Sequence, residues 1–227
     1  MCGKRIRQVI EEIRRYKIVV IVRGMEPELC STLSEALYAG GIRLMEITFD
    51  QNGRIPFEKT KDAILTLSKM WKDKMQIGAG TVLSIQQLYM AKEAGAGYIV
   101  TPNTNPAIIR EAKKLDMAVL AGAMTPSEIE EAYEAGADFV KLFPAAIVGT
   151  EYVRAVRAPL SHIPMLAVGG VNENNISDFL KTGVAGVGVG GNLVDPKLVM
   201  NRDYDKITAL ARQYVISAGV EEVVCPG

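Results

Sequence analysis

Short apolar runs recur along the chain, and amphipathic stretches separate them at a spacing of roughly 20–30 residues, which is the length of a strand–helix unit. The pattern predicts eight strands, at residues 18–23, 43–48, 76–81, 98–101, 118–122, 139–142, 165–169 and 185–190. Eight alternations of strand and helix predict a (β/α)8 TIM barrel, formed by residues 1–227 as a single domain. A doubly wound open sheet is the alternative that the pattern leaves open.

The predicted helices end in turns of small residues. A glycine just past a helix end adopts the left-handed conformation at little cost, so such turns mark where a helix gives way to a strand. The turns are Ala39-Gly40-Gly41, Ala94-Gly95-Ala96-Gly97, Ala135-Gly136-Ala137-Asp138 and Thr182-Gly183. An extra N-terminal helix at 4–16 and a final helix at 205–217 lie outside the eight units, and we expect 223–227 to form a loose tail.

Charge and cysteine usage narrow the class of protein. The 26 Lys and Arg residues balance 26 Asp and Glu residues, so the chain lacks the basic excess of a nucleic-acid binder. The apolar run at 18–22 is far too short to span a bilayer, and the charged helix before it does not read as a signal peptide. Cys2, Cys30 and Cys225 have neither disulfide nor metal spacing, which favours a reducing cytoplasm.

The only histidine of the sequence is His162, which precedes the seventh predicted strand. One histidine excludes a metal site built from several histidines. In a barrel, the start of a strand lies at the end away from the chemistry. We therefore expect His162 to be a surface residue without a catalytic role.

The candidate chemistry begins with Lys141, in the predicted strand 139–142. A period of two places Phe139, Lys141 and Phe143 on one face of this strand, and Val140 and Leu142 on the other. Both faces of a parallel sheet are covered, and burial of an ammonium group favours the loss of its proton. Because a neutral lysine amine is a nucleophile for ketones, Lys141 is a candidate Schiff-base residue. The alternative is a lysine at a strand end that extends into solvent.

Glu46 is the second candidate, in the predicted strand 43–48. Leu44, Glu46 and Thr48 share one face of this strand, so the carboxylate is expected to point into the barrel. A buried carboxylate is unfavourable unless it is paired, hydrogen-bonded or protonated. The functional hypothesis is a general acid and base whose pKa is raised by burial. The alternative is a structural ion pair with Lys141 or Arg23.

Two glycine pairs, Gly169-Gly170 and Gly190-Gly191, follow the seventh and eighth predicted strands. We expect each pair to expose backbone amides that open a helix, because such amides bind phosphate without a cation. The loops after strands seven and eight are also the common phosphate site of this fold. Ordinary turn formation is the alternative, since glycine is a frequent turn residue.

Other strand ends offer further substrate contacts. Arg23 can bind a carboxylate or phosphate with two parallel hydrogen bonds, or it can form a salt bridge at the rim. The hydroxyl of Thr81 follows Gly78-Ala79-Gly80, where small residues let a ligand approach or simply serve packing in the barrel. Thr48 and Pro102 lie at the ends of the second and fourth strands, where the chemistry of such barrels is located.

Together these motifs resemble those of the 2-keto-3-deoxy-6-phosphogluconate (KDPG) aldolases, including the bifunctional members that also split 4-hydroxy-2-oxoglutarate (KHG). The resemblance extends in order from about residue 18 to residue 194. The motifs that carry it are Glu46-Ile47-Thr48, Gly78-Ala79-Gly80-Thr81-Val82, Thr101-Pro102, Met124-Thr125-Pro126, Lys141-Leu142-Phe143-Pro144, Gly169-Gly170-Val171 and Gly188-Val189-Gly190.

The resemblance implies a class I aldolase that needs no metal or other cofactor and is usually a homotrimer. Its substrate would be a phosphorylated 2-keto-3-deoxy sugar acid, and pyruvate would be one product. By resemblance, Lys141 is the Schiff-base lysine, Glu46 moves the proton, and Thr81 helps to hold the pyruvate carboxylate. The two glycine pairs would hold the phosphate, and the remaining expected substrate contacts are Arg23, Thr48, Pro102, Phe143 and Val168.

The chain departs from the family pattern in places. Some members carry an arginine for the pyruvate carboxylate directly after the Glu-x-Thr-x motif; here that position is Asp50, which would repel it. Arg23-Gly24 resembles the Leu-Arg-Gly of the 6-phosphogalactonate branch, and we expect Arg23 to take over this role. Ala167-Val168-Gly169-Gly170 also resembles that branch. Gly191 stands where serine is frequent and lacks its hydroxyl donor.

Two other functions stay open at this point. A phosphosugar isomerase or epimerase on the same fold would need a pair of carboxylates or histidines, or a metal, and the buried lysine argues against it. A non-catalytic phosphosugar-binding barrel would keep the same loops without turnover. Detectable release of pyruvate would distinguish the aldolase from this second alternative.

Overall fold

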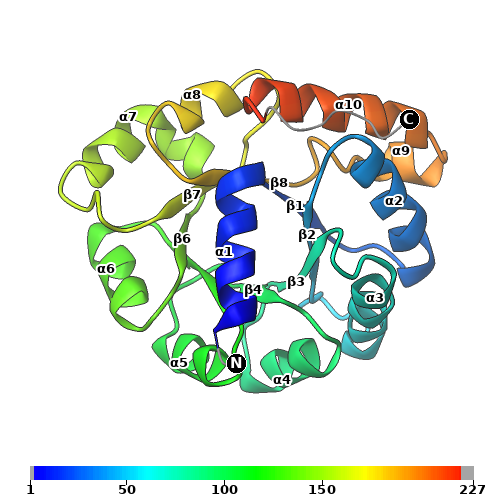
Figure 1. Cartoon of the computed structure of the whole chain (residues 1–227), viewed down its shortest axis with the longest axis horizontal. Coiled ribbons are helices and arrows are strands. Elements are labelled where there is room, and N and C mark those ends of the chain that lie inside the picture. The colour runs from blue at the N-terminus through cyan, green and yellow to red at the C-terminus, as the bar shows by residue number, and fades with distance from the viewer. Residues whose placement is uncertain (1–2, 221–227) are drawn as a thin grey trace.

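The computed structural model of the protein describes residues 3–220, and its eight strands form a closed parallel barrel (Figure 1). Each strand pairs with the next one in the chain, and β8 closes the barrel against β1. The strands are β1 (Ile18–Val22), β2 (Leu44–Thr48), β3 (Gln76–Gly80), β4 (Tyr98–Val100), β5 (Ala118–Ala123), β6 (Phe139–Leu142), β7 (Met165–Val168) and β8 (Gly186–Val189). The predicted barrel is confirmed, and the open doubly wound sheet is excluded.

Helices form a ring around the barrel, with α10 beside α2 (Figure 1). The helices are α1 (Lys4–Tyr16), α2 (Pro27–Ala39), α3 (Phe57–Met70), α4 (Ile85–Glu93), α5 (Pro106–Lys114), α6 (Pro126–Glu134), α7 (Ala145–Arg157), α8 (Ile176–Leu180), α9 (Pro196–Met200) and α10 (Tyr204–Ser217). Within residues 3–220, none of them is both long and apolar enough to cross a bilayer. The expected tail at 223–227 lies outside the described residues.

The predicted small-residue turns connect helices to strands as expected. The glycines Gly41, Gly95, Gly136 and Gly183 all have positive φ, from 84° to 104°. An L-residue with a side chain adopts this backbone only with strain, so each turn requires glycine there. These turns let each strand start directly after the preceding helix.

Alternate residues of each strand belong to two different hydrophobic layers, one outside the barrel and one inside it. Met45 and Ile47 of β2 pack outward against the ring of helices, while Leu44 of the same strand packs inside the barrel. In β6, Val140 points outward and Phe139 inward. The period-two prediction is therefore confirmed for both strands, and Glu46 and Lys141 fall on the inward face by the same alternation.

Helix α1 closes one end of the barrel, and Figure 1 shows it lying across the opening. Its residues Val9 and Ile13, one helical turn apart, are fully buried with Leu44 and Phe139 of the barrel interior. Both of these partners lie at or next to the first residue of their strands. Because α1 closes the end where the strands start, the opposite end is the one that stays open to ligands.

Glycines in β3 make room inside the barrel for side chains of the neighbouring strands. A Cβ on Gly78 would overlap the ring of Tyr98 from β4, and a Cβ on Gly80 would lie 2.5 Å from Oε1 of Glu46 from β2. The packing role that the sequence left open for this segment is thus present. A side chain at Gly80 would displace the Glu46 carboxylate.

Candidate active site

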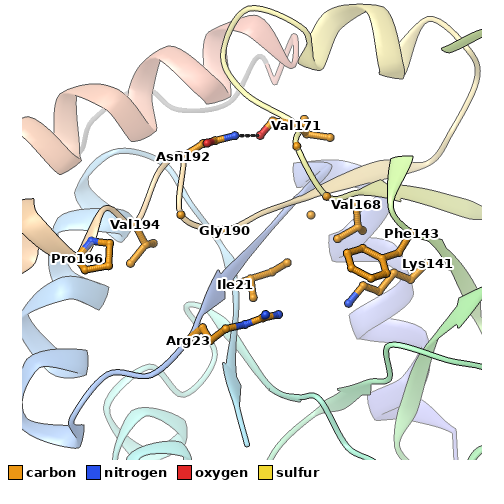
Figure 2. A pocket seen from close by; sticks show the side chains of 14 residues that line it. Ile21, Arg23, Lys141, Phe143, Val168, Val171, Gly190, Asn192, Val194 and Pro196 are labelled. Atoms are coloured by element: carbon orange, nitrogen blue, oxygen red, sulfur yellow. Dashed lines mark hydrogen bonds between the residues drawn. The ribbon is translucent and has the colours of Figure 1, made fainter. Parts of the chain in front are cut away.

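A cavity of about 440 Å³ opens at the carboxyl ends of the strands, between β1, β6, β7 and β8 (Figure 2). Its lining brings together eight of the predicted site residues: Arg23, Lys141, Phe143, Val168, Gly169, Gly170, Gly190 and Gly191. The chemistry was expected at this end of the barrel, and this cavity lies there. Its volume is typical of a site for a small metabolite.

Lys141 is buried in the wall of this cavity, with only 6 % of its surface exposed. It sits in β6 between Gly122 of β5 and Leu166 of β7, and its Nζ lies 5.1 Å from the centre of the Phe143 ring. Burial lowers the pKa of Lys141; the negative charge of Glu46 opposes this shift, and the positive charge of Arg23 adds to it. The side chain therefore does not extend into bulk solvent, and the lowered pKa favours the nucleophilic free amine.

Glu46 lies below the cavity, in the centre of β2, with 2 % of its surface exposed. Burial raises the pKa of Glu46 to about 7, although Lys141 and Arg23 both act in the opposite direction. A carboxyl group with this pKa exchanges a proton readily near neutral pH. Among the described residues, neither a salt bridge nor a hydrogen bond joins Glu46 to Lys141 or Arg23, and their charges interact at longer range.

A second, much smaller cavity of about 10 Å³ connects the two ionisable groups. Glu46 and Lys141 are its polar lining residues, and the other lining side chains are apolar. This space is about the size of one water molecule. Ile21 and Val168 line both cavities and form part of the boundary between them.

Arg23 follows β1 directly and is exposed at the cavity rim. Figure 2 shows its guanidinium group and the Lys141 amine on facing sides of the cavity. Asp50 lies away from this cavity: its carboxylate accepts hydrogen bonds from the backbone N–H groups of Asn52, Arg54 and Ile55. The carboxylate of Asp50 therefore stabilises its own loop, and Arg23 is the cation at the cavity.

The two glycine pairs have different structural requirements. Gly169 and Gly170 have φ values of 94° and 79°, and a Cβ on Gly170 would lie 2.5 Å from the Cβ of Ala146. Gly190 and Gly191 have no such φ, and nothing lies within 3.4 Å of a Cβ built on either one. Only the first pair is required to be glycine by its backbone.

The loops that carry the two glycine pairs are joined by side-chain amides. Asn192 Nδ2 donates to the carbonyl oxygen of Val171 at 3.0 Å, the hydrogen bond drawn in Figure 2. Asn175 Nδ2 donates to the carbonyl oxygen of Gly170 at 3.1 Å. These contacts hold the loop backbone in place around the cavity.

The expected helices directly after the glycine pairs are wrong. Helix α8 begins only at Ile176, and no helix follows Gly191 before α9 begins at Pro196. Residues 172–175 instead form turns, in which Asn172 N–H donates to Asn175 Oδ1 and Asn172 Oδ1 accepts from the N–H groups of Asn174 and Asn175. Asparagine side chains compete for backbone groups in this way and delay a helix. The glycine pairs therefore lie in loops and not at helix N-termini.

Three predicted substrate contacts line neither of these two cavities: Thr48, Thr81 and Pro102. Thr48 is buried beside Gly80, and its hydroxyl has no partner among the described residues. Thr81 has a φ of 54°, and its carbonyl oxygen accepts from Gln51 Nε2 at 3.2 Å. The backbone of Pro102 packs against Gly122.

The cavity also contains residues that were not identified from the sequence as site residues. Ile21 is one of them. It lies two residues after Val19 in β1, so the period of two places both side chains inside the barrel and could have identified Ile21. Val194 and Pro196 follow the β8 loop and complete one wall. No periodic pattern marks a loop residue, so these two required the folded chain. Among residues 3–220, no three His, Cys, Asp or Glu side chains form a group that could hold a metal ion.

His162 is exposed in the loop before β7, at the opposite end of the barrel from the cavity. Its imidazole packs edge-on against Tyr133, with ring centres 5.6 Å apart. The prediction of a surface position is confirmed.

The chain is similar in sequence to known aldolases of one family. The family model described as KDPG and KHG aldolase matches residues 9–210. A 2-dehydro-3-deoxy-phosphogluconate aldolase of Haemophilus influenzae is 33 % identical, over 92 % of this chain and 96 % of its own. A probable 2-dehydro-3-deoxy-6-phosphogalactonate aldolase of Rhizobium meliloti is 36 % identical, over 79 % of this chain and 82 % of its own.

Solved structures agree with the sequence relatives. A KDPG aldolase of Legionella pneumophila, with pyruvate captured as a covalent carbinolamine intermediate, is 28 % identical with a TM-score of 0.79. The match covers 88 % of this chain and 94 % of that one. With a buried lysine and glutamate at the open end of a (β/α)8 barrel and a family model that spans most of its length, this chain belongs to the KDPG and KHG aldolase family.

Proposed function

We propose that this protein is a class I aldolase that cleaves KDPG, or its C4 epimer the 6-phosphogalactonate, to pyruvate and glyceraldehyde 3-phosphate. The observation that carries the proposal is the buried Lys141 amine, with its lowered pKa, in the wall of the cavity. The carbinolamine captured in the Legionella relative supports covalent chemistry at a lysine. An isomerase or epimerase is disfavoured, because the family of this chain is an aldolase family.

The first chemical step is attack of the free Lys141 amine on the C2 ketone of the substrate. Proton transfer and loss of water convert the carbinolamine into a cationic iminium, which withdraws electrons from the C3–C4 bond. The low pKa of Lys141 helps here, because a larger share of the enzyme carries the nucleophilic amine. Phe143, whose ring lies 5.1 Å from Nζ, forms the outer boundary of this position.

Glu46 then removes the proton of the C4 hydroxyl, directly or through one water in the small cavity between Glu46 and Lys141. The C3–C4 bond breaks, its electrons move to the enamine, and glyceraldehyde 3-phosphate leaves. Protonation of the enamine at C3 and hydrolysis of the imine release pyruvate and restore Lys141. A pKa of about 7 suits Glu46 to both the base and the acid role.

Substrate binding is assigned to the rim of the cavity. Arg23 is the candidate for the pyruvate carboxylate, because its guanidinium group faces Lys141 and forms no salt bridge with a carboxylate among the described residues. The amides of the Gly169-Gly170 and Gly190-Gly191 loops are the candidates for the phosphate. Phosphate bound remote from the reacting carbons contributes binding energy that positions the scissile bond.

Several finer assignments extend this proposal. KHG, which would give pyruvate and glyoxylate, is a second candidate substrate. We also propose a homotrimer in the cytoplasm, acting as one barrel domain. Leu83, Ile85 and Tyr89 around the start of α4 support a partner chain, since about two-fifths of each side chain's surface is exposed. Light scattering of the purified protein measures the oligomeric state.

The test of the function is release of pyruvate, coupled to lactate dehydrogenase, from each C4 epimer and from KHG. We expect turnover of at least one phosphorylated epimer, with and without EDTA. Binding of both epimers without any pyruvate release would support a non-catalytic phosphosugar-binding barrel. Activity that is lost in EDTA and restored by zinc or magnesium would reject the class I assignment.

A further inference from the structure

A separate cavity of about 210 Å³ lies at the opposite end of the barrel from the active site. Its lining includes Arg14 of α1, Arg157 at the end of α7, and Ser161 and His162 of the loop before β7, together with the start of β7. We call these four side chains and the space between them the basal pocket. The strand starts and α1 separate it from the cavity around Lys141.

The charged residues that line the basal pocket, Arg14 and Arg157, are both positive. Two guanidinium groups and the imidazole of His162 face it, and no Asp or Glu is among its lining residues. In the described part of the chain, neither Arg14 nor Arg157 forms an ion pair with a carboxylate. A neighbouring cavity of about 350 Å³ differs in this respect, because Asp73 lies beside its cations Arg5 and Lys72.

The two cations and the imidazole of the basal pocket are each held by a contact of their own. Arg157 Nη1 donates to the carbonyl oxygen of Thr182 at 2.6 Å, and a Cβ at Gly183 would overlap this guanidinium group. The Arg14 guanidinium lies 5.8 Å from the centre of the Phe139 ring. His162 packs against Tyr133. Groups held in this way lose little conformational entropy when a ligand binds.

Arg157 also has a free donor in this part of the structure. Its Nε is buried, and no acceptor among the described residues receives its hydrogen. A buried N–H without an acceptor is unfavourable, so native structures supply one from the protein, a water or a ligand. Since Nη1 is already bonded to Thr182, the remaining donors of Arg157 are available to an anion.

We propose that the basal pocket binds a phosphate group, free or as the monoester of a small metabolite. Guanidinium groups match the oxygens of phosphate with parallel hydrogen bonds, and the Ser161 hydroxyl and the His162 imidazole provide further donors. This site is distinct from the glycine loops at the active site, because it lies at the other end of the strands and uses side-chain cations.

The test is protection of individual arginines from phenylglyoxal, followed by peptide mass spectrometry. Inorganic phosphate and glycerol 3-phosphate are the probes, and sodium chloride at equal ionic strength controls for screening. When about nine-tenths of the sites are occupied, Arg14 and Arg157 should react about tenfold more slowly, because only the free fraction reacts. Arg110, which is exposed on α5, is the internal control and should react at an unchanged rate.

Variants decide whether the two arginines share one ligand. Arg14→Gln removes an exposed charge, and the phosphate concentration that half-protects Arg157 should rise by about tenfold or more. Arg110→Gln removes the same charge elsewhere and should leave this concentration unchanged. Equal protection by chloride, equal protection of Arg110, or an unchanged value in Arg14→Gln would overturn the proposal. Arg23 protection reports on the active-site cavity in the same experiment, so failure at one site is not read as failure at the other.

Discussion

The floor and the rim of the active-site cavity are built in opposite ways. By the floor we mean Lys141, in the lower wall of the cavity, and Glu46, directly below it. Both are side chains on regular strands with little exposure to solvent, and burial lowers the pKa of Lys141 and raises that of Glu46. At the rim, the two glycine loops are partly exposed backbone held by asparagine side chains. The difference shows that desolvation shifts the pKa values of buried strand side chains, whereas the loops at the rim offer backbone amides that are held in place by side-chain hydrogen bonds.

The removal of the floor nucleophile should have the largest effect. We expect Lys141→Ala to lower kcat by at least about 10⁴-fold, the scale found when a covalent nucleophile is deleted. Pyruvate with borohydride should leave a pyruvate-sized adduct on Lys141 of the wild type, detected by mass spectrometry. Lys69→Ala, which removes an exposed lysine of α3, is the control and should retain full activity. An adduct on another lysine, with Lys141→Ala still active, would reject the mechanism.

The second floor residue should have the next largest effect. Glu46→Gln keeps the shape and removes the base, so kcat should fall by roughly 10²–10⁴-fold. Trapping of the pyruvate imine at Lys141 should be less affected than overall turnover, because Glu46 acts on the C4 hydroxyl. Glu35→Gln, at an exposed position of α2, is the matched control. Turnover of Glu46→Gln at the wild-type rate would make Glu46 a purely structural residue.

The pH dependence of kcat/KM should reflect the ionisation of Glu46. Glu46 must be ionised to remove the C4 proton, and its pKa is raised to about 7. Activity is therefore lost as the pH falls through this value: kcat/KM should drop by about tenfold per pH unit well below it. The limb centred near pH 7 should be lost from the residual activity of Glu46→Gln, which keeps only the requirement for the free amine of Lys141. A limb that persists unchanged in the variant would assign the titration to another group.

Changes at the rim should be smaller and selective for the phosphate. Gly170→Ala places a Cβ 2.5 Å from that of Ala146 on a backbone with a φ of 79°, so the loop must shift. A strain of about 1–2 kcal/mol corresponds to a rise in KM of roughly 5–30-fold for the phosphorylated substrate. KHG, which has no phosphate, should be affected much less.

Gly191→Ser is the matched control for this rim prediction. Nothing lies within 4 Å of a Cβ built at Gly191, so serine fits there and adds a donor. We expect no rise in KM from Gly191→Ser. If Gly191→Ser raised KM as much as Gly170→Ala does, the rim would be sensitive to any added side chain and not to backbone geometry.

The boundary between floor and rim should give the smallest effect. Val168 lines both cavities, and a threonine there would have nearly the same shape with an added hydroxyl. One hydrogen bond to the C4 hydroxyl changes the relative rate for the two epimers by about two- to twelvefold. The wild type is therefore expected to accept both epimers with a preference for the galactonate form, and Val168→Thr to shift the kcat/KM ratio toward the gluconate form. Val168→Ala is the control, because it changes the shape of the side chain without adding a hydroxyl. An unchanged kcat/KM ratio of the two epimers in Val168→Thr would show that other residues set the specificity.

Much of the site was predictable because its residues lie on regular strands. The period of two placed Lys141 and Glu46 on the inward face, and it also marks Ile21, which was not assigned to the site. The loops were harder to predict. Asn172 and Asn175 form side-chain turns that delay α8, and the wall formed by Val194 and Pro196 has no periodic signal. Local patterns describe strands well and irregular loops poorly.

The sequence by itself determined the order of the strands, the phase of each strand and the positions that require glycine at helix ends, because these depend on neighbours in the chain. Only the tertiary structure decided that Glu46 has a pKa near 7, that Asp50 is bound within its own loop, and that Arg14, Arg157 and His162 face one basal pocket. These properties depend on desolvation and on charges from distant segments. Such interactions exist only when the barrel has closed.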